Sequence, residues 1–114
     1  MGKVVAIIPA RGGSKGIPRK NLKDFNGIPL VAHTIKQAKS SKHIDLVVVN
    51  SEDDEIRRVA KQFGAKVMDR PEEFHHDNTI QEVDRLLIWT VNELTKRCED
   101  ISVIVLLYST APLR

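Results

Sequence analysis

Residues 4–21 of this 114-residue chain, VVAIIPARGGSKGIPRKN, decide its fold. The first five are small or β-branched and apolar throughout, which is typical of a strand buried on both faces of a parallel sheet. Glycines and cations follow as soon as Pro9 interrupts the apolar run. The stretch therefore predicts a central strand whose carboxyl end leads into a loop suited to binding an anion.

Beyond this stretch, hydrophobic periodicity predicts strands and helices that alternate along the chain. Apolar runs predict strands at 45–50, 65–68 and 101–107, the last as a further central strand. Helical spacing of apolar residues predicts helices that begin near residues 30, 53 and 79. The order β-α-β-α-β-α-β predicts a Rossmann-like α/β fold, a mostly parallel sheet with helices on both faces.

Polar residues and a glycine mark the predicted helix ends. Ser51 or Asp53 is placed to cap the second helix, and Gly64 is placed to end it. Thr79 and Glu82 have the spacing of a capping box at the start of the third helix.

The length indicates one α/β domain spanning residues 1–114. A content of 41% apolar and 29% charged residues is typical of a globular protein in water. A net charge of +3 does not imply nucleic-acid binding, and the composition is not that of a membrane protein. The single cysteine, Cys98, and the absence of a secretory h-region predict a cytoplasmic location. Because the chain stops just past the last predicted strand, we expect a fragment, a naturally short form, or a partner subunit on the open side.

The loop after the first strand is predicted to hold the phosphates of a nucleoside triphosphate. Glycines let backbone N–H groups approach an anion, and nearby cations offset its charge. The spacing of Gly12, Gly13 and Gly16 departs from the dinucleotide fingerprint G-x-G-x-x-G. Lys20 is followed by Asn21, which departs from the P-loop pattern. The alternative, a basic surface loop without a function, is a poor use of glycine beside a buried strand.

Residues 7–21 resemble the signature of the CMP-sialic acid synthetases, the cytidylyltransferases that activate sialic acid and related nonulosonic acids. Supporting matches occur at Asn26–Leu30, Ser51–Ile56, Phe63–Ala65 and Leu106–Arg114. The resemblance implies a fold of the nucleotide-diphospho-sugar transferase type. It also implies a reaction in which CMP passes from CTP to a sialic acid-like nonulosonic acid and pyrophosphate is released.

The resemblance also implies roles for single residues. Arg11 and Lys20 are the expected catalytic residues, and Arg70, Asn78 and Tyr108 are expected to contact the sugar substrate. The residues expected to bind the nucleotide are Ala10, Arg11, Gly12, Gly13, Ser14, Lys15, Lys20, Asn21, Asp77 and Thr79. Mg²⁺ is the implied cofactor, with its ligands outside this chain, and a homodimer is the implied assembly.

Two departures from the family pattern limit what the resemblance implies. Tyr108 stands where the family commonly has Gln, and Ser109 stands where Pro is usual, so the choice of base or sugar can differ. Family members also continue well past this length, into a segment with metal-binding carboxylates and a dimerisation subdomain. A non-catalytic nucleotide-binding or assembly module derived from the same fold is therefore the alternative function.

Other chemistry-bearing residues have simpler interpretations. Acidic residues 52–54 could be metal ligands, but a first helical turn ordinarily carries such charges. His75 and His76 are adjacent, and adjacent side chains rarely converge on one ion. Trp89 is predicted to pack in the core or at an interface rather than to stack on a ligand.

Overall fold

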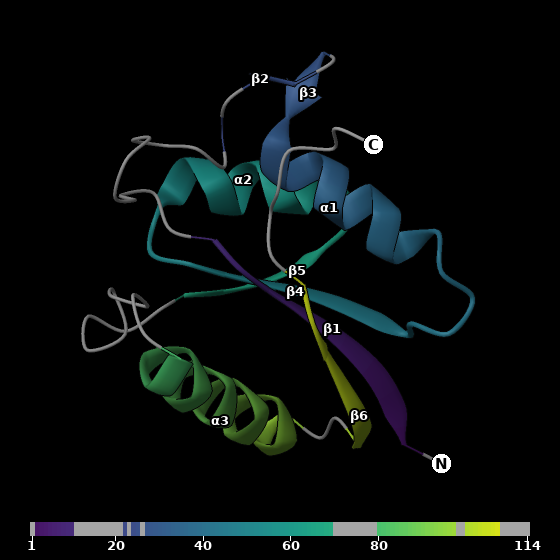
Figure 1. Ribbon diagram of the computed structural model, residues 1–114, viewed down its shortest axis with the longest axis vertical. Helices are drawn as coiled ribbons and strands as arrows, with labels where there is room; N and C mark the ends of the chain where they lie inside the picture. The colour runs from purple at the N-terminus through teal and green to yellow at the C-terminus, as the bar shows by residue number, and fades with distance from the viewer. Residues whose placement is uncertain are drawn as a thin grey trace.

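The computed structural model describes residues 2–10, 22, 24–25, 27–69, 80–97 and 100–107. Four parallel strands form one sheet in the order β5-β4-β1-β6 (Figure 1). Their bounds are β1 Lys3–Pro9, β4 Leu46–Ser51, β5 Lys66–Asp69 and β6 Ile101–Leu106. The helices are α1 Leu30–Lys39, α2 Asp54–Gln62 and α3 Ile80–Lys96. The predicted alternation of parallel strands and helices is confirmed.

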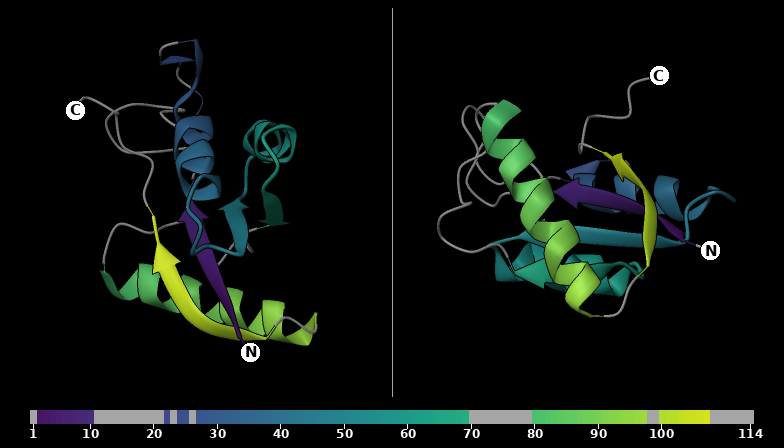
Figure 2. Two further views of the ribbon diagram at one scale, coloured as in Figure 1. Left: turned by 90° about the vertical axis from the view of Figure 1, so that its right-hand side faces the viewer. Right: turned by 90° about the horizontal axis from the view of Figure 1, so that it is seen from below.

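Helices cover both faces of the sheet, as Figure 2 shows from the side and from below. Alternate residues of β1 point to opposite faces, as the pleat of a strand requires. Ala6 and Ile8 belong to the core cluster under α1 and α2, whereas Val5 and Ile7 belong to the cluster that includes Leu94 of α3. All four β1 residues are fully buried, so the prediction of a central first strand is confirmed.

Local chemistry sets the ends of α2. Asp53, not Ser51, is the N-cap, because its Oδ1 accepts from the backbone N–H groups of Glu55 and Ile56 at 2.9 and 3.1 Å. Gly64 follows the helix with φ +89°, a left-handed conformation that glycine adopts without a Cβ penalty. The prediction that Gly64 ends this helix is confirmed. The predicted Thr79–Glu82 capping box lies outside the described residues.

Two features differ from the sequence prediction. A short antiparallel pair, β2 Asp24–Phe25 and β3 Ile28–Pro29, precedes α1 and was not predicted. Each strand has only two residues, too few to show a periodicity. The prediction of a central β6 is wrong for the described sheet, because β6 forms its edge and Val103 is 48% exposed. An apolar run identifies a strand, but its place in the sheet depends on which strands pair with it.

No helix within the described ranges is long and apolar enough to span a lipid bilayer.

Candidate functional site

The strand order defines where a ligand binds in this fold. From β1 the chain proceeds through α1 to β4 on one side, and α3 later returns it to β6 on the other side of β1. Helices α1 and α3 lie on opposite faces (Figure 2). The carboxyl ends of β1 and β6 therefore flank a topological switch point, the crevice where open α/β sheets bind ligands.

The first predicted site residue, Ala10, lies at this switch point. It is fully buried directly after β1, and its N–H donates to the Asn50 carbonyl oxygen of β4 at 2.9 Å. Because the ladder of hydrogen bonds runs up to Ala10, the glycine- and cation-rich loop leaves the sheet from a fixed point. The other predicted site residues lie outside the described residues: Arg11, Gly12, Gly13, Ser14, Lys15, Lys20, Asn21, Arg70, Asp77, Asn78, Thr79 and Tyr108.

The opposite side of the crevice is fixed in the same way. The N–H of Leu107, just past β6, donates to the Ile7 carbonyl oxygen of β1 at 3.0 Å. Tyr108 follows Leu107 in the sequence. Ala10 and Leu107 thus lie at the carboxyl ends of neighbouring strands, although they are far apart in the sequence.

One polar side chain of the carboxyl edge is enclosed in the core. Asn50 of β4 is fully buried, and its Nδ2 donates to Thr90 Oγ1 of α3 at 3.1 Å. Its side-chain oxygen is buried and has no hydrogen-bond partner among the described residues. Asn50 was not among the predicted site residues. Its position in the sequence could have indicated it, because Asn50 is the first polar residue after the apolar run Leu46–Val49.

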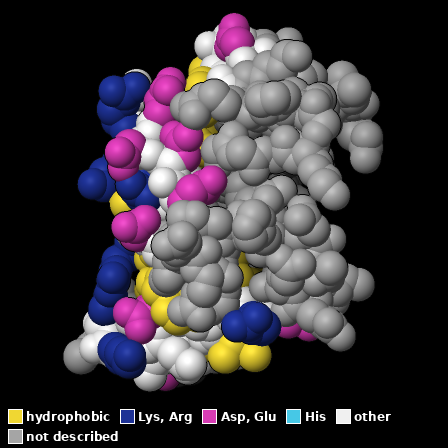
Figure 3. Space-filling view, turned by 90° about the vertical axis from the view of Figure 1, so that its left-hand side faces the viewer, with side chains coloured by type: hydrophobic (Ala, Val, Ile, Leu, Met, Phe, Trp, Pro, Cys, Tyr) yellow, Lys and Arg dark blue, Asp and Glu magenta, His cyan; other side chains and the backbone are white. Residues whose placement is uncertain are grey.

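An arginine links the carboxyl ends of β4 and β5. Arg57 Nη1 of α2 donates to the Ser51 carbonyl oxygen at 2.7 Å and to Asp69 Oδ1 at 2.8 Å, and its Nη2 pairs with Asp54. The arginine side chain is only 20% exposed, while both carboxylates are largely in solvent. Figure 3 shows acidic and basic side chains side by side on the described part of this face. The segment 70–79 therefore starts from an anchored residue, Asp69.

The acidic residues after β4 have structural roles. Asp53 caps α2 and Asp54 pairs with Arg57, as expected for the first turn of a helix. Within the described ranges, no group of three His, Cys, Asp or Glu side chains is arranged to hold a metal ion. Trp89 packs against the core cluster that contains Val5 and Ile7, so its predicted packing role is confirmed. His75, His76 and Cys98 lie outside the described residues.

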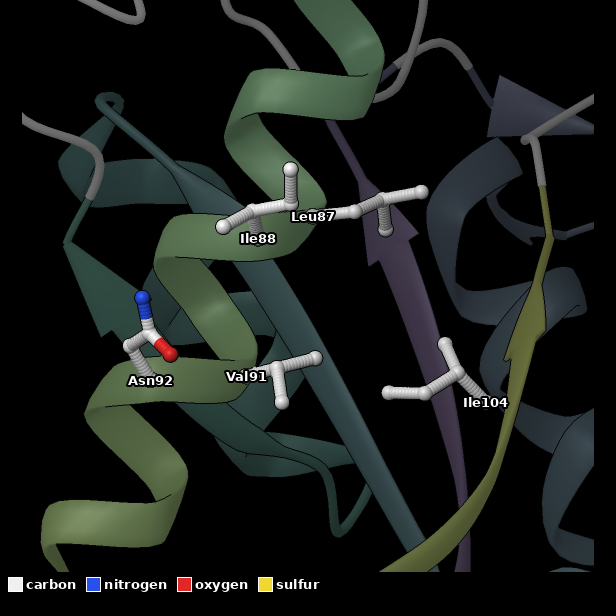
Figure 4. Close-up of a pocket in the computed structure, with 5 residues that line it drawn as sticks. All are labelled: Leu87, Ile88, Val91, Asn92 and Ile104. Carbon is white, nitrogen blue, oxygen red and sulfur yellow. The ribbon is translucent and has the colours of Figure 1, made fainter.

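An apolar pocket of about 290 Å³ lies between α3 and the edge strand (Figure 4). Its lining residues are Leu87, Ile88, Val91 and Asn92 of α3 and Ile104 of β6. None of them belongs to the carboxyl edge of the sheet, and the only polar one is Asn92. The pocket is therefore separate from the crevice between β1 and β6.

A family model described as Cytidylyltransferase matches residues 5–113, which includes every strand and helix above except the first two residues of β1. The chain belongs to the cytidylyltransferase family. Its parallel sheet with helices on both faces is the predicted fold of the nucleotide-diphospho-sugar transferase type.

Relatives of this chain act on nonulosonic acids, according to their names. An N-acylneuraminate cytidylyltransferase from Oncorhynchus mykiss is 38% identical over 109 residues, which are 96% of this chain and 24% of that protein. A pseudaminic acid cytidylyltransferase from Campylobacter jejuni is 55% identical over 64 residues, which are 56% of this chain and 28% of that protein. The chain thus spans about a quarter of the length of these curated relatives.

Solved structures share the fold at lower identity. CMP:2-keto-3-deoxy-manno-octonic acid synthetase, in a structure with CTP, has a TM-score of 0.79 and 22% identity, over 99% of this chain and 42% of that one. A cytidylyltransferase from Leptospira borgpetersenii serovar Hardjo-bovis has a TM-score of 0.72 and 22% identity, over 96% of this chain and 42% of that one. At this identity, the likeness establishes the fold alone.

Proposed function

We propose that this chain is the nucleotide-binding part of an enzyme that transfers CMP from CTP to a sialic acid-like nonulosonic acid. The observation that carries the proposal is the match of nearly the whole chain to N-acylneuraminate cytidylyltransferases. The fold supports it, because the loop that follows Ala10 leaves β1 at the switch point where such a ligand binds.

In this proposal, the loop after β1 binds the triphosphate. Backbone N–H groups of Gly12 and Gly13 and the Ser14 hydroxyl donate to phosphate oxygens. Lys15 and Asn21 complete the nucleotide contacts of the loop. Arg11 and Lys20 are the catalytic residues, and they stabilise the negative charge that grows on the departing pyrophosphate.

Segments from two other strand ends complete the proposed site. After β5, Asp77 and Thr79 contact the nucleotide, and Arg70 and Asn78 contact the sugar. Tyr108 contacts the sugar from the end of β6. A tyrosine hydroxyl cannot reproduce the paired donor and acceptor of an amide, so a change in sugar or base preference is expected here.

The proposed reaction requires no protein nucleophile. The anomeric hydroxyl oxygen of the sugar acid attacks the α-phosphorus of CTP, a P–O bond forms to the sugar, and the bond to the β-phosphate oxygen breaks. The hydroxyl proton leaves to solvent, and the electron pair leaves with pyrophosphate. Such a displacement depends on alignment and charge neutralisation, which a rigid strand end and a cationic loop can supply.

Three further expectations belong to this proposal. Mg²⁺ would neutralise phosphate charge, but the described residues offer no ligand set for it, so no step is assigned to it. We also propose a homodimer, which the resemblance implies, and a cytoplasmic location, which the short N-terminal apolar run and the single cysteine favour. Sedimentation of the purified chain tests the dimer, and a fluorescent fusion tests the location.

Calorimetric titration tests binding, and release of pyrophosphate tests catalysis. We expect the chain to bind CTP more tightly than ATP, GTP or UTP, and to release pyrophosphate from CTP when N-acetylneuraminic or pseudaminic acid is added. CTP binding without turnover, with either sugar and with Mg²⁺ present, would support the alternative of a non-catalytic nucleotide-binding module. Failure to bind CTP would contradict both functions.

A further inference from the structure

Asn50 lies where the core meets the carboxyl edge of the sheet. In the register of the strands it stands beside Pro9 of β1 and Met68 of β5, and its backbone carbonyl holds Ala10. Val48, two positions earlier, belongs to the core cluster on the α3 face. Since side chains two apart on a strand share a face, Asn50 also points toward α3, as its contact with Thr90 confirms.

The contact with Thr90 indicates how the Asn50 amide is oriented, with Nδ2 toward Thr90 and Oδ1 away from it. Thr90 Oγ1 donates its one proton to the Leu86 carbonyl oxygen at 2.8 Å. The hydroxyl can therefore only accept from the amide, and the group facing it is the donor Nδ2. A flipped amide would place its oxygen against an oxygen that has no free proton. The acceptor Oδ1 is thus held on the side away from Thr90.

Within the part of the chain that the structure describes, this oxygen has no hydrogen-bond donor although it is buried. A buried acceptor without a donor destabilises a fold more than an apolar side chain of the same shape would. On the same face of the sheet, Ile7, Val48 and Met68 form a buried apolar cluster, so an apolar residue would suit the position. Asn50 is therefore a poor choice for stability at a position one residue from the end of the strand.

We propose that Asn50 is a specificity-determining residue, whose side-chain oxygen accepts a hydrogen bond from an N–H or O–H group of the substrate bound at the carboxyl edge. The inference rests on the proposed function and adds a contact that selects among substrates. Deprotonated phosphate oxygens only accept hydrogen bonds, so the triphosphate cannot satisfy this oxygen. The donor comes from the amino or hydroxyl groups of the nucleoside, or from the sugar acid.

The variant Asn50→Leu tests the proposal, because leucine removes the acceptor with little change in size. Calorimetry compares CTP with inorganic triphosphate, which has phosphates but no nucleoside donors. We expect CTP to bind about three- to tenfold more weakly, as for one neutral hydrogen bond, while triphosphate affinity is unchanged. If CTP and triphosphate are both unaffected and KM for the sugar acid rises instead, the donor belongs to the sugar.

Variants of Thr90 test the same contact without touching Asn50. Thr90→Val removes the hydroxyl that orients the amide, so CTP should bind more weakly, whereas Thr90→Ser keeps the hydroxyl and should bind like the wild type. Thr34→Val, which removes a buried hydroxyl from α1 on the other face, is the matched control and should leave CTP affinity unchanged.

Two results would overturn the inference. In the first, the wild type binds both ligands, and Asn50→Leu changes both affinities and the KM for the sugar acid by one common factor, or changes none of them. The other, decisive if Asn50→Leu does not fold, is that Thr90→Val, Thr90→Ser and the wild type have the same CTP affinity and the same KM for the sugar acid. A wild-type chain that binds neither ligand contradicts the proposed function itself, and this inference with it.

Discussion

Arg57 Nη1 lies 2.8 Å from Asp69 Oδ1, and the same nitrogen lies 2.7 Å from the Ser51 carbonyl oxygen. One guanidinium thereby connects α2 to the last residues of two neighbouring strands, β4 and β5. Arginine suits this position because its planar group donates several hydrogen bonds in fixed directions. The carboxyl edge that carries the proposed site is therefore tied together by a side chain that we do not expect to touch substrate.

Replacing Arg57 should separate its two kinds of contact. Arg57→Met loses the partly buried hydrogen bond to the Ser51 carbonyl, and we expect a loss of about 1 kcal/mol in unfolding free energy, measured by urea denaturation. Asp69→Asn should cost less than about 0.5 kcal/mol, because that carboxylate is exposed and such ion pairs contribute little. Arg58→Met, at an exposed position of the same helix, is the control. Equal losses in Arg57→Met and Arg58→Met would contradict this assignment.

The cap of α2 gives a second prediction for stability. Asp53→Ala leaves two backbone N–H groups of the first turn without their acceptor, and should lower the unfolding free energy by about 1 kcal/mol. Guanidinium denaturation should show a lower midpoint with an unchanged slope. Asp53→Asn retains an acceptor oxygen and should lose less. If Asn and Ala were equally destabilising, the charge of Asp53 rather than the cap would account for the effect.

Gly64 provides a prediction about backbone conformation. At φ +89° an alanine is strained, so Gly64→Ala should destabilise the chain by about 1–2 kcal/mol. An added Cβ would lie 2.9 Å from Lys39 Nζ, but that is the end of a flexible side chain that can move. Gly64→Asn should therefore be milder than Gly64→Ala, since asparagine tolerates the left-handed region better. Thermal melts would rank the two variants, and the reverse order would show that the added volume decides.

The loop after β1 gives the prediction closest to function. Arg11→Ala should weaken CTP binding by about 1.5–3 kcal/mol, the range for hydrogen bonds to charged groups. Lys42→Ala, which removes an exposed cation after α1, keeps the same net charge as Arg11→Ala and is the matched control. Calorimetric affinities of the two variants separate a direct contact from a general loss of positive charge. An unchanged CTP affinity in Arg11→Ala would remove this residue from the proposed site.

Much of the fold followed from local patterns, and the exceptions have physical causes. The apolar runs at 4–8 and 45–50 predicted strands that the structure buries almost completely. The run at 101–107 has the same character but forms an exposed edge, because burial depends on neighbours that a run of residues does not specify. The β2–β3 pair was missed because two-residue strands carry no repeat.

The candidate site was likewise predictable only in part. Glycines and cations directly after a buried strand were enough to predict an anion loop, and the strand end at Ala10 lies where that prediction requires. The contacts that brace the edge were not predictable, since Asn50 and Thr90 are 40 residues apart and Arg57 and Asp69 are 12 apart. Their partners depend on how whole helices pack on the sheet.

The sequence by itself determined the helices and the strands of the four-stranded sheet, because hydrophobic periodicity and helix-end residues act over a few neighbouring positions. It also predicts that the loop after the first strand binds phosphate, and this stays a prediction. Only the tertiary structure decided the strand order, the edge position of β6 and the unpaired oxygen of Asn50. These depend on pairing and packing between distant segments, which lower the free energy only when the whole sheet is assembled.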